Sequence, residues 1–139
     1  YQLQCVYDGI EQAGKVTNNG IILLNKSQSV QRQRFTVMHE LGHYLLGHVG
    51  SDPRYRDSSR TAEEQEADRF AVGCLMPACV LWALHATTAE EIAALCNVSM
   101  QAAEIRSRRM QILLARNKFL THPLERQVFE QFQQFINNQ

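Results

Sequence analysis

Three residues near the middle of the chain have the types and the spacing of a metal-dependent hydrolytic site. The stretch FTVMHELGHYLLGH contains an HExxH pattern formed by His39, Glu40 and His43. Histidines four positions apart lie on one face of an α-helix, so both imidazoles can reach a single ion. Catalytic zinc usually has three protein ligands and a water, on which Glu40 would act as general base. The pattern predicts a zinc hydrolase, although a pattern this short also occurs by chance around ordinary polar histidines.

His48 is an unfavourable candidate for the third metal ligand. Metzincins place a third histidine ligand six residues after the second, whereas His48 follows His43 by five. If the helix continued at 100° per residue, His48 would point well away from the face that carries His39 and His43. We therefore expect His48 to be a surface residue near a helix end, where its charge suits the helix dipole.

The third metal ligand is expected in TAEEQEADRFA, which offers Glu63, Glu64 and Glu66. Glu64 and Asp68 are four residues apart and share a helical face, so Glu64 could bind the ion while Asp68 holds the other nitrogen of a ligating histidine. This chemistry favours Glu64. Two alternatives stay open: Thr61 and Glu64 match a capping box, and the other glutamates could be solvated residues of a first helical turn.

Strands and helices must position these residues. In the N-terminal part, YQLQCVY and GIILLN read as strands, and the apolar spacing becomes helical from about Gln31. GIILLN is interpreted either as an edge strand, which could bind an extended substrate by strand addition, or as a core strand. The polar segment 50–60 reads as an exposed loop, and a second helix is expected over 61–75.

The C-terminal half reads as helical throughout. Residues 87–97 and 99–115 predict a helical hairpin, and an apolar stripe in the tail predicts a packing helix. The predicted fold class is α+β, with a small, mainly antiparallel N-terminal sheet packed on a zincin-like HExxH helix. We expect one domain over 1–139, in which 1–80 holds the sheet and zinc-site helices and 81–139 forms a helical subdomain.

The composition of the chain limits the classes of protein to which it could belong. The chain has 139 residues, 45% apolar and 20% charged, as expected for one globular domain. Fourteen basic and fourteen acidic side chains cancel, which makes nucleic-acid binding an unfavoured function but leaves a local basic patch open. No apolar run reaches a membrane-spanning length, and no signal-peptide pattern follows Tyr1. Four cysteines without CxxC spacing predict a reduced, cytoplasmic protein.

Three segments in order resemble the ImmA/IrrE family of metallopeptidases: RFTVMHELGHYLLGH, EQEADRFAVGCLMP and EEIAALCNVSMQAAEIR. The resemblance implies that His39 and His43 bind zinc, that Glu40 is the catalytic glutamate, and that Glu64 is the third ligand in a gluzincin layout. Asp68 matches a family position held by Asn or Asp. The implied function is an intracellular zinc endopeptidase with a regulatory protein as substrate, such as a helix-turn-helix repressor.

The resemblance determines neither the shape of the substrate groove nor the identity of the oxyanion stabiliser. Gly47 is inserted before His48, where relatives often read HxLLH. A tetrahedral intermediate needs a stabiliser besides the metal, and Tyr44, His85 and Arg106 all stay candidates.

Two functions compete with the peptidase. The hairpin at 87–115 resembles a helix-turn-helix and carries Arg106, Arg108 and Arg109 on its second helix, so it could bind DNA. A complete zinc site is also compatible with a non-catalytic, metal-dependent regulatory module.

Overall fold

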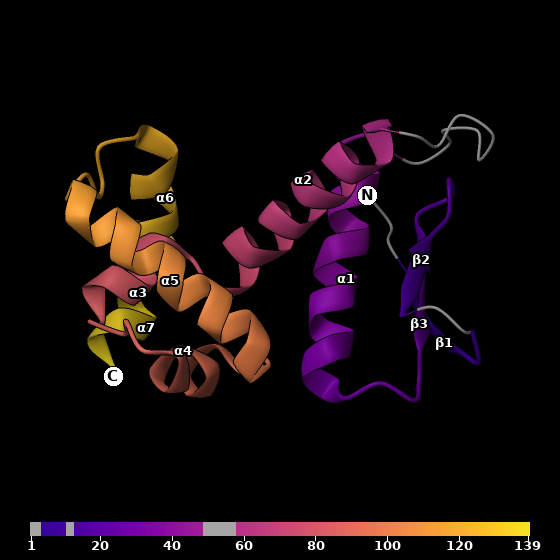
Figure 1. Cartoon of the computed structure of the whole chain (residues 1–139), viewed down its shortest axis with the longest axis horizontal. Helices are drawn as coiled ribbons and strands as arrows, with labels where there is room; N and C mark the ends of the chain where they lie inside the picture. Colours follow the sequence, from indigo (N-terminus) through magenta and orange to yellow (C-terminus); the bar gives the residue numbers. More distant parts are fainter. Residues whose placement is uncertain (1–3, 11–12, 49–57) are drawn as a thin grey trace. The chain divides into compact units, whose positions relative to one another are not determined.

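The computed structural model of the chain describes residues 4–10, 13–48 and 58–139 (Figure 1). The predicted loop at 50–60 therefore lies largely outside the described residues. The chain divides into two compact units, Tyr1–Cys74 and Leu75–Gln139, which are described separately below. The predicted fold class is confirmed, because a small sheet is followed by a helical half. The expected single domain stays a prediction.

The first unit contains a three-stranded sheet made of β1 (Gln4–Asp8), β2 (Gly14–Val16) and β3 (Ile21–Asn25), in the order β1-β3-β2. β3 pairs in parallel with β1 and antiparallel with β2, so the sheet is mixed where a mainly antiparallel one was expected. The reason is topological: β1 and β2 run in opposite directions and β3 lies between them.

β3 is the central strand among those described, so the interpretation of GIILLN as an edge strand is wrong. Ile22 and Leu24 are buried, whereas the described side chains of β1 are exposed. Ile21 and Leu23, which alternate with them, are only partly buried, so one face of β3 packs on the core. β2 provides an edge instead, and it joins β3 through a turn in which Gly20 has a φ of +77°.

Helix α1 (Val30–Leu45) packs against this sheet (Figure 1). It begins after Ser29, whose hydroxyl accepts a hydrogen bond from the N–H of Arg32. A small apolar core joins sheet and helix, and it consists of Val16, Ile22 and Leu24 with Val37, Leu41 and Tyr44 packed against them. Because residues 39–43 lie within α1, the HExxH pattern is helical, as predicted.

Helix α2 (Ser58–Leu75) crosses α1 where α1 carries a glycine. A Cβ on Gly42 would lie 3.2 Å from the Cα of Ala67 and 3.2 Å from the Cβ of Phe70. The absence of a side chain at Gly42 thus allows the two helices to approach closely. α2 starts three residues before Thr61, which therefore lies inside the helix rather than at its N-cap, so the capping-box alternative for Glu64 is wrong.

The second unit is built from five helices within the described residues: α3 (Ala78–Ala83), α4 (Ala89–Cys96), α5 (Met100–Arg116), α6 (Pro123–Gln131) and α7 (Gln133–Asn137). The predicted hairpin is confirmed as α4 and α5, joined by a left-handed Asn97 and capped by Ser99. Arg106 is buried, and its Nε and Nη2 donate to the carbonyl of Met76 at 2.9 and 2.6 Å. This arginine holds the unit together and does not face outward as a DNA-reading residue would.

The expected tail helix is divided into α6 and α7. Trp82 of α3 stacks on Phe119, with ring centroids 5.1 Å apart, and also contacts the ring of Phe129 on α6. In the described part of the chain, no helix combines the length and apolar character needed to cross a bilayer.

Candidate metal centre

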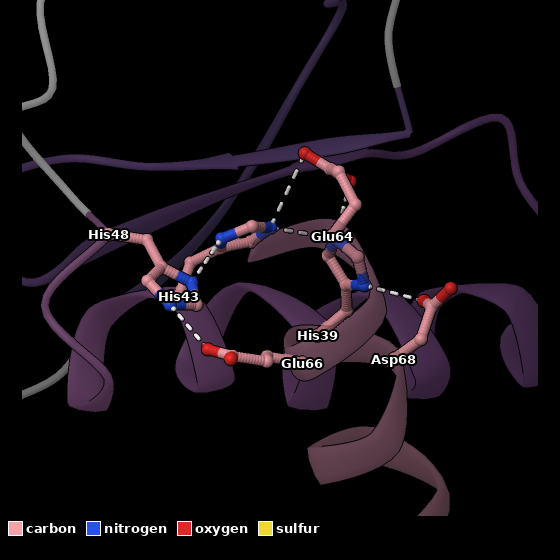
Figure 2. Close-up of polar contacts among 6 residues, drawn as sticks. All are labelled: His39, His43, His48, Glu64, Glu66 and Asp68. Atoms are coloured by element: carbon pink, nitrogen blue, oxygen red, sulfur yellow. Dashed lines mark hydrogen bonds and ion pairs between the residues drawn. The ribbon is translucent and has the colours of Figure 1, made fainter. Parts of the chain in front are cut away.

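Two imidazoles and a carboxylate converge between α1 and α2 (Figure 2). The Nε2 atoms of His39 and His43 lie 3.0 Å apart. Oε2 of Glu64 lies 3.3 Å from Nε2 of His39, and Oε1 lies 3.6 Å from Nε2 of His43. The structure therefore brings together the three residues for which the sequence predicted metal binding.

These separations suit one small ion. Atoms that lie about 2.0–2.1 Å from a tetrahedral zinc ion are about 3.3 Å from one another. The two nitrogens are 3.0 Å apart, each lies 3.3 or 3.6 Å from a different oxygen of Glu64, and one ligand atom from each of the three residues lies within 4.8 Å of the other two. Two nitrogens and one oxygen donor also match the ligand preference of a catalytic zinc with an open fourth position. The arrangement is a possible metal site, and it lies wholly in the first unit.

The remaining nitrogen of His39 has a carboxylate partner. Nδ1 of His39 lies 2.8 Å from Oδ1 of Asp68, one helical turn after Glu64 on α2. The predicted juxtaposition of Asp68 with a histidine is thus present, and it leaves Nε2 of His39 facing Glu64. A carboxylate at Nδ1 fixes the tautomer and the orientation of the ring.

Glu40 extends toward β2. The backbone N–H of Val16 donates to its carboxylate, and the absence of a side chain at Gly14 leaves room beside Glu40 Cγ. Burial raises the pKa of Glu40 above 4.5, although nearby His39 and the Val16 N–H oppose the shift. A carboxylate with a raised pKa is a better proton acceptor, which suits a general base.

His43 is poised as a neutral ligand. Burial lowers its pKa below 6.5, and the nearby His39 lowers it further. A neutral imidazole keeps the nitrogen lone pair that a metal requires. This electrostatic setting would favour metal binding at pH 7 without competition from a proton.

The expectation for His48 is wrong. Its Nδ1 lies 3.1 Å from Nδ1 of His43, its Nε2 lies 3.2 Å from Oε2 of Glu66, and its side chain is only 9% exposed. The sequence argument assumed that the helix continued, but α1 ends at Leu45 and Gly47 has a φ of +78°. The chain turns back and places His48 beside His43.

The candidate oxyanion stabilisers stay undecided. Tyr44 packs against the core of the first unit. In the second unit, Arg106 is buried against Met76 and His85 is an exposed residue with a φ of +54°. The role of any of the three in catalysis remains a prediction.

Comparison with known proteins agrees with this geometry. The family model Peptidase_M78, described as the IrrE N-terminal-like domain, matches residues 7–108. The match includes both helices of the candidate metal centre, and in the second unit it covers α3, α4 and the first half of α5. No curated protein matches the chain significantly. Because the family match covers most of the sequence, the chain belongs to the Peptidase_M78 family of metallopeptidases.

Proposed function

We propose that this protein is a zinc-dependent endopeptidase of the gluzincin type, which cleaves a regulatory protein in the cytoplasm. The observation that carries the proposal is the convergence of His39, His43 and Glu64 beside the carboxylate of Glu40. A set of metal ligands without a base beside it would also suit a structural metal site. A base with a raised pKa next to an open three-ligand centre favours hydrolysis.

The donor set favours zinc over the harder divalent ions. Magnesium and calcium prefer oxygen ligands, whereas two imidazole nitrogens with one carboxylate are a common zinc arrangement. With the negative charge of Glu64, the three ligands would leave a zinc centre with a net positive charge. When bound, the metal would polarise the scissile carbonyl and lower the pKa of the attacking water.

Glu40 is assigned the proton transfers. Its carboxylate would accept a proton from the water as the new C–O bond forms, and would pass it to the leaving nitrogen as the C–N bond breaks. The N–H of Val16 holds this carboxylate in place, and burial raises its affinity for the proton. Each proton and each bond is accounted for without any other side chain.

Asp68 is assigned a positioning role. Its carboxylate accepts a hydrogen bond from Nδ1–H of His39, which directs the lone pair of Nε2 toward the metal position. The substrate class rests on the family resemblance, which suggests a helix-turn-helix repressor. The cytoplasmic location rests on the sequence, whose four cysteines show no CxxC spacing and no disulfide framework.

The test compares Glu40→Gln with the wild type, using as substrate a helix-turn-helix repressor encoded beside this gene. We expect one zinc per chain in both proteins and cleavage only in the wild type, with activity reduced at least about 100-fold. Glu90→Gln, an exposed carboxylate-to-amide change on α4, is the matched control and should cleave normally. Wild-type activity in the Glu40→Gln variant would refute the mechanism. Bound zinc without cleavage of any such repressor would favour the non-catalytic regulatory module.

A further inference from the structure

We propose that His48 is a positioning residue for His43, and that Glu66 in turn holds His48. Nδ1 of His43 lies 3.1 Å from Nδ1 of His48, and Nε2 of His48 lies 3.2 Å from Oε2 of Glu66 (Figure 2). The inference rests on the proposed zinc site, because it concerns how one ligand of that site is oriented.

The backbone explains how His48 reaches this place. The N–H of His48 donates to the carbonyl of His43 at 2.9 Å, and the N–H of Gly47 donates to the carbonyl of Tyr44 at 3.3 Å. These two bonds, with Gly47 in the left-handed region, form a Schellman motif. This motif brings the residue after the glycine back against the third-last residue of the helix. Here those two residues are both histidines.

The side chains are packed rather than solvated. The rings of His43 and His48 lie edge to face, with centroids 5.2 Å apart and an angle of 69° between their planes. The side chain of His48 is 9% exposed, whereas that of Glu66 is 50% exposed. His48 therefore lies between a metal ligand and a carboxylate at the surface. A buried imidazole with both nitrogens in hydrogen-bond range is held in one orientation.

If His43 binds a metal, the protons in the hydrogen bonds from His43 through His48 to Glu66 can be arranged in only one way. Nε2 of His43 faces Glu64 and must offer its lone pair to the ion, so the proton of a neutral ring is on Nδ1. That N–H donates to Nδ1 of His48, whose own proton must then be on Nε2. The second N–H donates to Glu66. Each N–H in this arrangement meets an acceptor.

The two zinc-binding histidines are thus supported in different ways. His39 reaches a carboxylate directly through Asp68, whereas His43 reaches Glu66 through the ring of His48. Losing an outer partner of this kind typically weakens metal binding about 10- to 100-fold. We expect a loss of that size when His48 can no longer accept the proton of His43.

The experiment measures zinc affinity by competition with a chromophoric chelator for the wild type, His48→Asn, His48→Gln and His48→Ala. The amide oxygen of Asn can occupy the position of Nδ1, whereas the Gln amide reaches the position of Nε2. His48→Asn should therefore stay within a few-fold of the wild type, and the other two variants should lose about 10- to 100-fold. His122→Gln, an exposed histidine in the second unit, is the matched control and should bind zinc normally.

Two further measurements separate the possible results. Thermal unfolding of each metal-free variant in excess chelator tests for a purely structural role, which would lower stability without separating Asn from Gln. Equal zinc affinity in all His48 variants, or an equal loss in the Asn and Gln variants, would overturn the inference and leave the zinc site standing. Failure of the wild type to bind zinc, or undiminished binding by Glu64→Ala, would overturn the proposed function and this inference together.

Discussion

Replacing Gly42 with alanine should weaken metal binding by moving Glu64, in addition to a modest change in the stability of the fold. The added Cβ would lie 3.2 Å from the Cα of Ala67 and from the Cβ and Cδ1 of Phe70. Ordinary contacts of this kind are about 3.5–4.0 Å, so α2 must move away by a few tenths of an ångström. Glu64 lies on α2, three residues before Ala67, and should move with the helix.

The effects on stability oppose each other. Alanine gains about 1 kcal/mol over glycine in a helix interior, while overpacking costs about 1–3 kcal/mol. The net change for Gly42→Ala is therefore a loss of about 0–2 kcal/mol. Gly73→Ala is the matched control, because Gly73 also lies in a helix and a Cβ there meets no atom within 4 Å. Gly73→Ala should stabilise the protein by about 0.5–1 kcal/mol, because its only effect is to reduce the backbone entropy that is lost on folding.

Metal binding should also weaken. Functional ligand sets must be held within about 0.5 Å, and a shift of Glu64 by a few tenths of an ångström uses up much of that tolerance, so zinc affinity should fall by up to about 10-fold. The assay combines denaturant unfolding of the metal-free protein with chelator competition for zinc. If Gly42→Ala stabilises the protein as much as Gly73→Ala and binds zinc as tightly as the wild type, the close approach of the helices does not set the site.

Two further predictions follow from β2 and the residues beside it. The raised pKa of Glu40 means that the folded, metal-free protein takes up a proton more readily than the unfolded chain, so its ionisation opposes folding above the folded pKa. Glu40→Gln should therefore stabilise the apoprotein at pH 7, and urea titrations should show that advantage shrinking as the pH falls toward 4.5; a gap that widens on acidification contradicts the assignment. A Cβ at Gly14 would collide with Cγ2 of Thr36, so Gly14→Ala should cost about 1–3 kcal/mol in thermal unfolding. Adding Thr36→Ser removes that methyl and should recover most of the loss; no recovery would place the strain elsewhere.

Local patterns in the sequence predicted much of the site. The spacing of His39, Glu40 and His43 placed these three side chains on one helix, and the four-residue spacing of Glu64 and Asp68 favoured the glutamate that meets both imidazoles. The structure has these side chains in the predicted positions because their placement depends on the period of an α-helix, which holds whatever the rest of the chain does, while their roles stay predictions.

Predictions that depended on where an element ends, or on which strands pair, were less successful. His48 was placed on the surface because the helix was extended past Gly47, whereas the glycine ends it and reverses the chain. A histidine before and after such a glycine, at positions that a Schellman motif brings together, was the signal that could have found the contact. The central place of β3 depends on pairing with β1, whose residues lie 17 positions earlier and carry no local sign of their partner.

The division of side chains between the two helices has a thermodynamic consequence. α1 and its terminal turn contribute the imidazoles of His39, His43 and His48, while α2 contributes the carboxylates of Glu64, Glu66 and Asp68. An ion bound by both helices would join positions 43 and 64 and so close a loop of the chain, much as a covalent cross-link does. Ligand binding at about 1,000 times Kd adds about 4 kcal/mol to the free energy of unfolding. For a chain of this size that is a large share of the total, so the supply of zinc would govern how long the folded protein survives as well as whether it can cut.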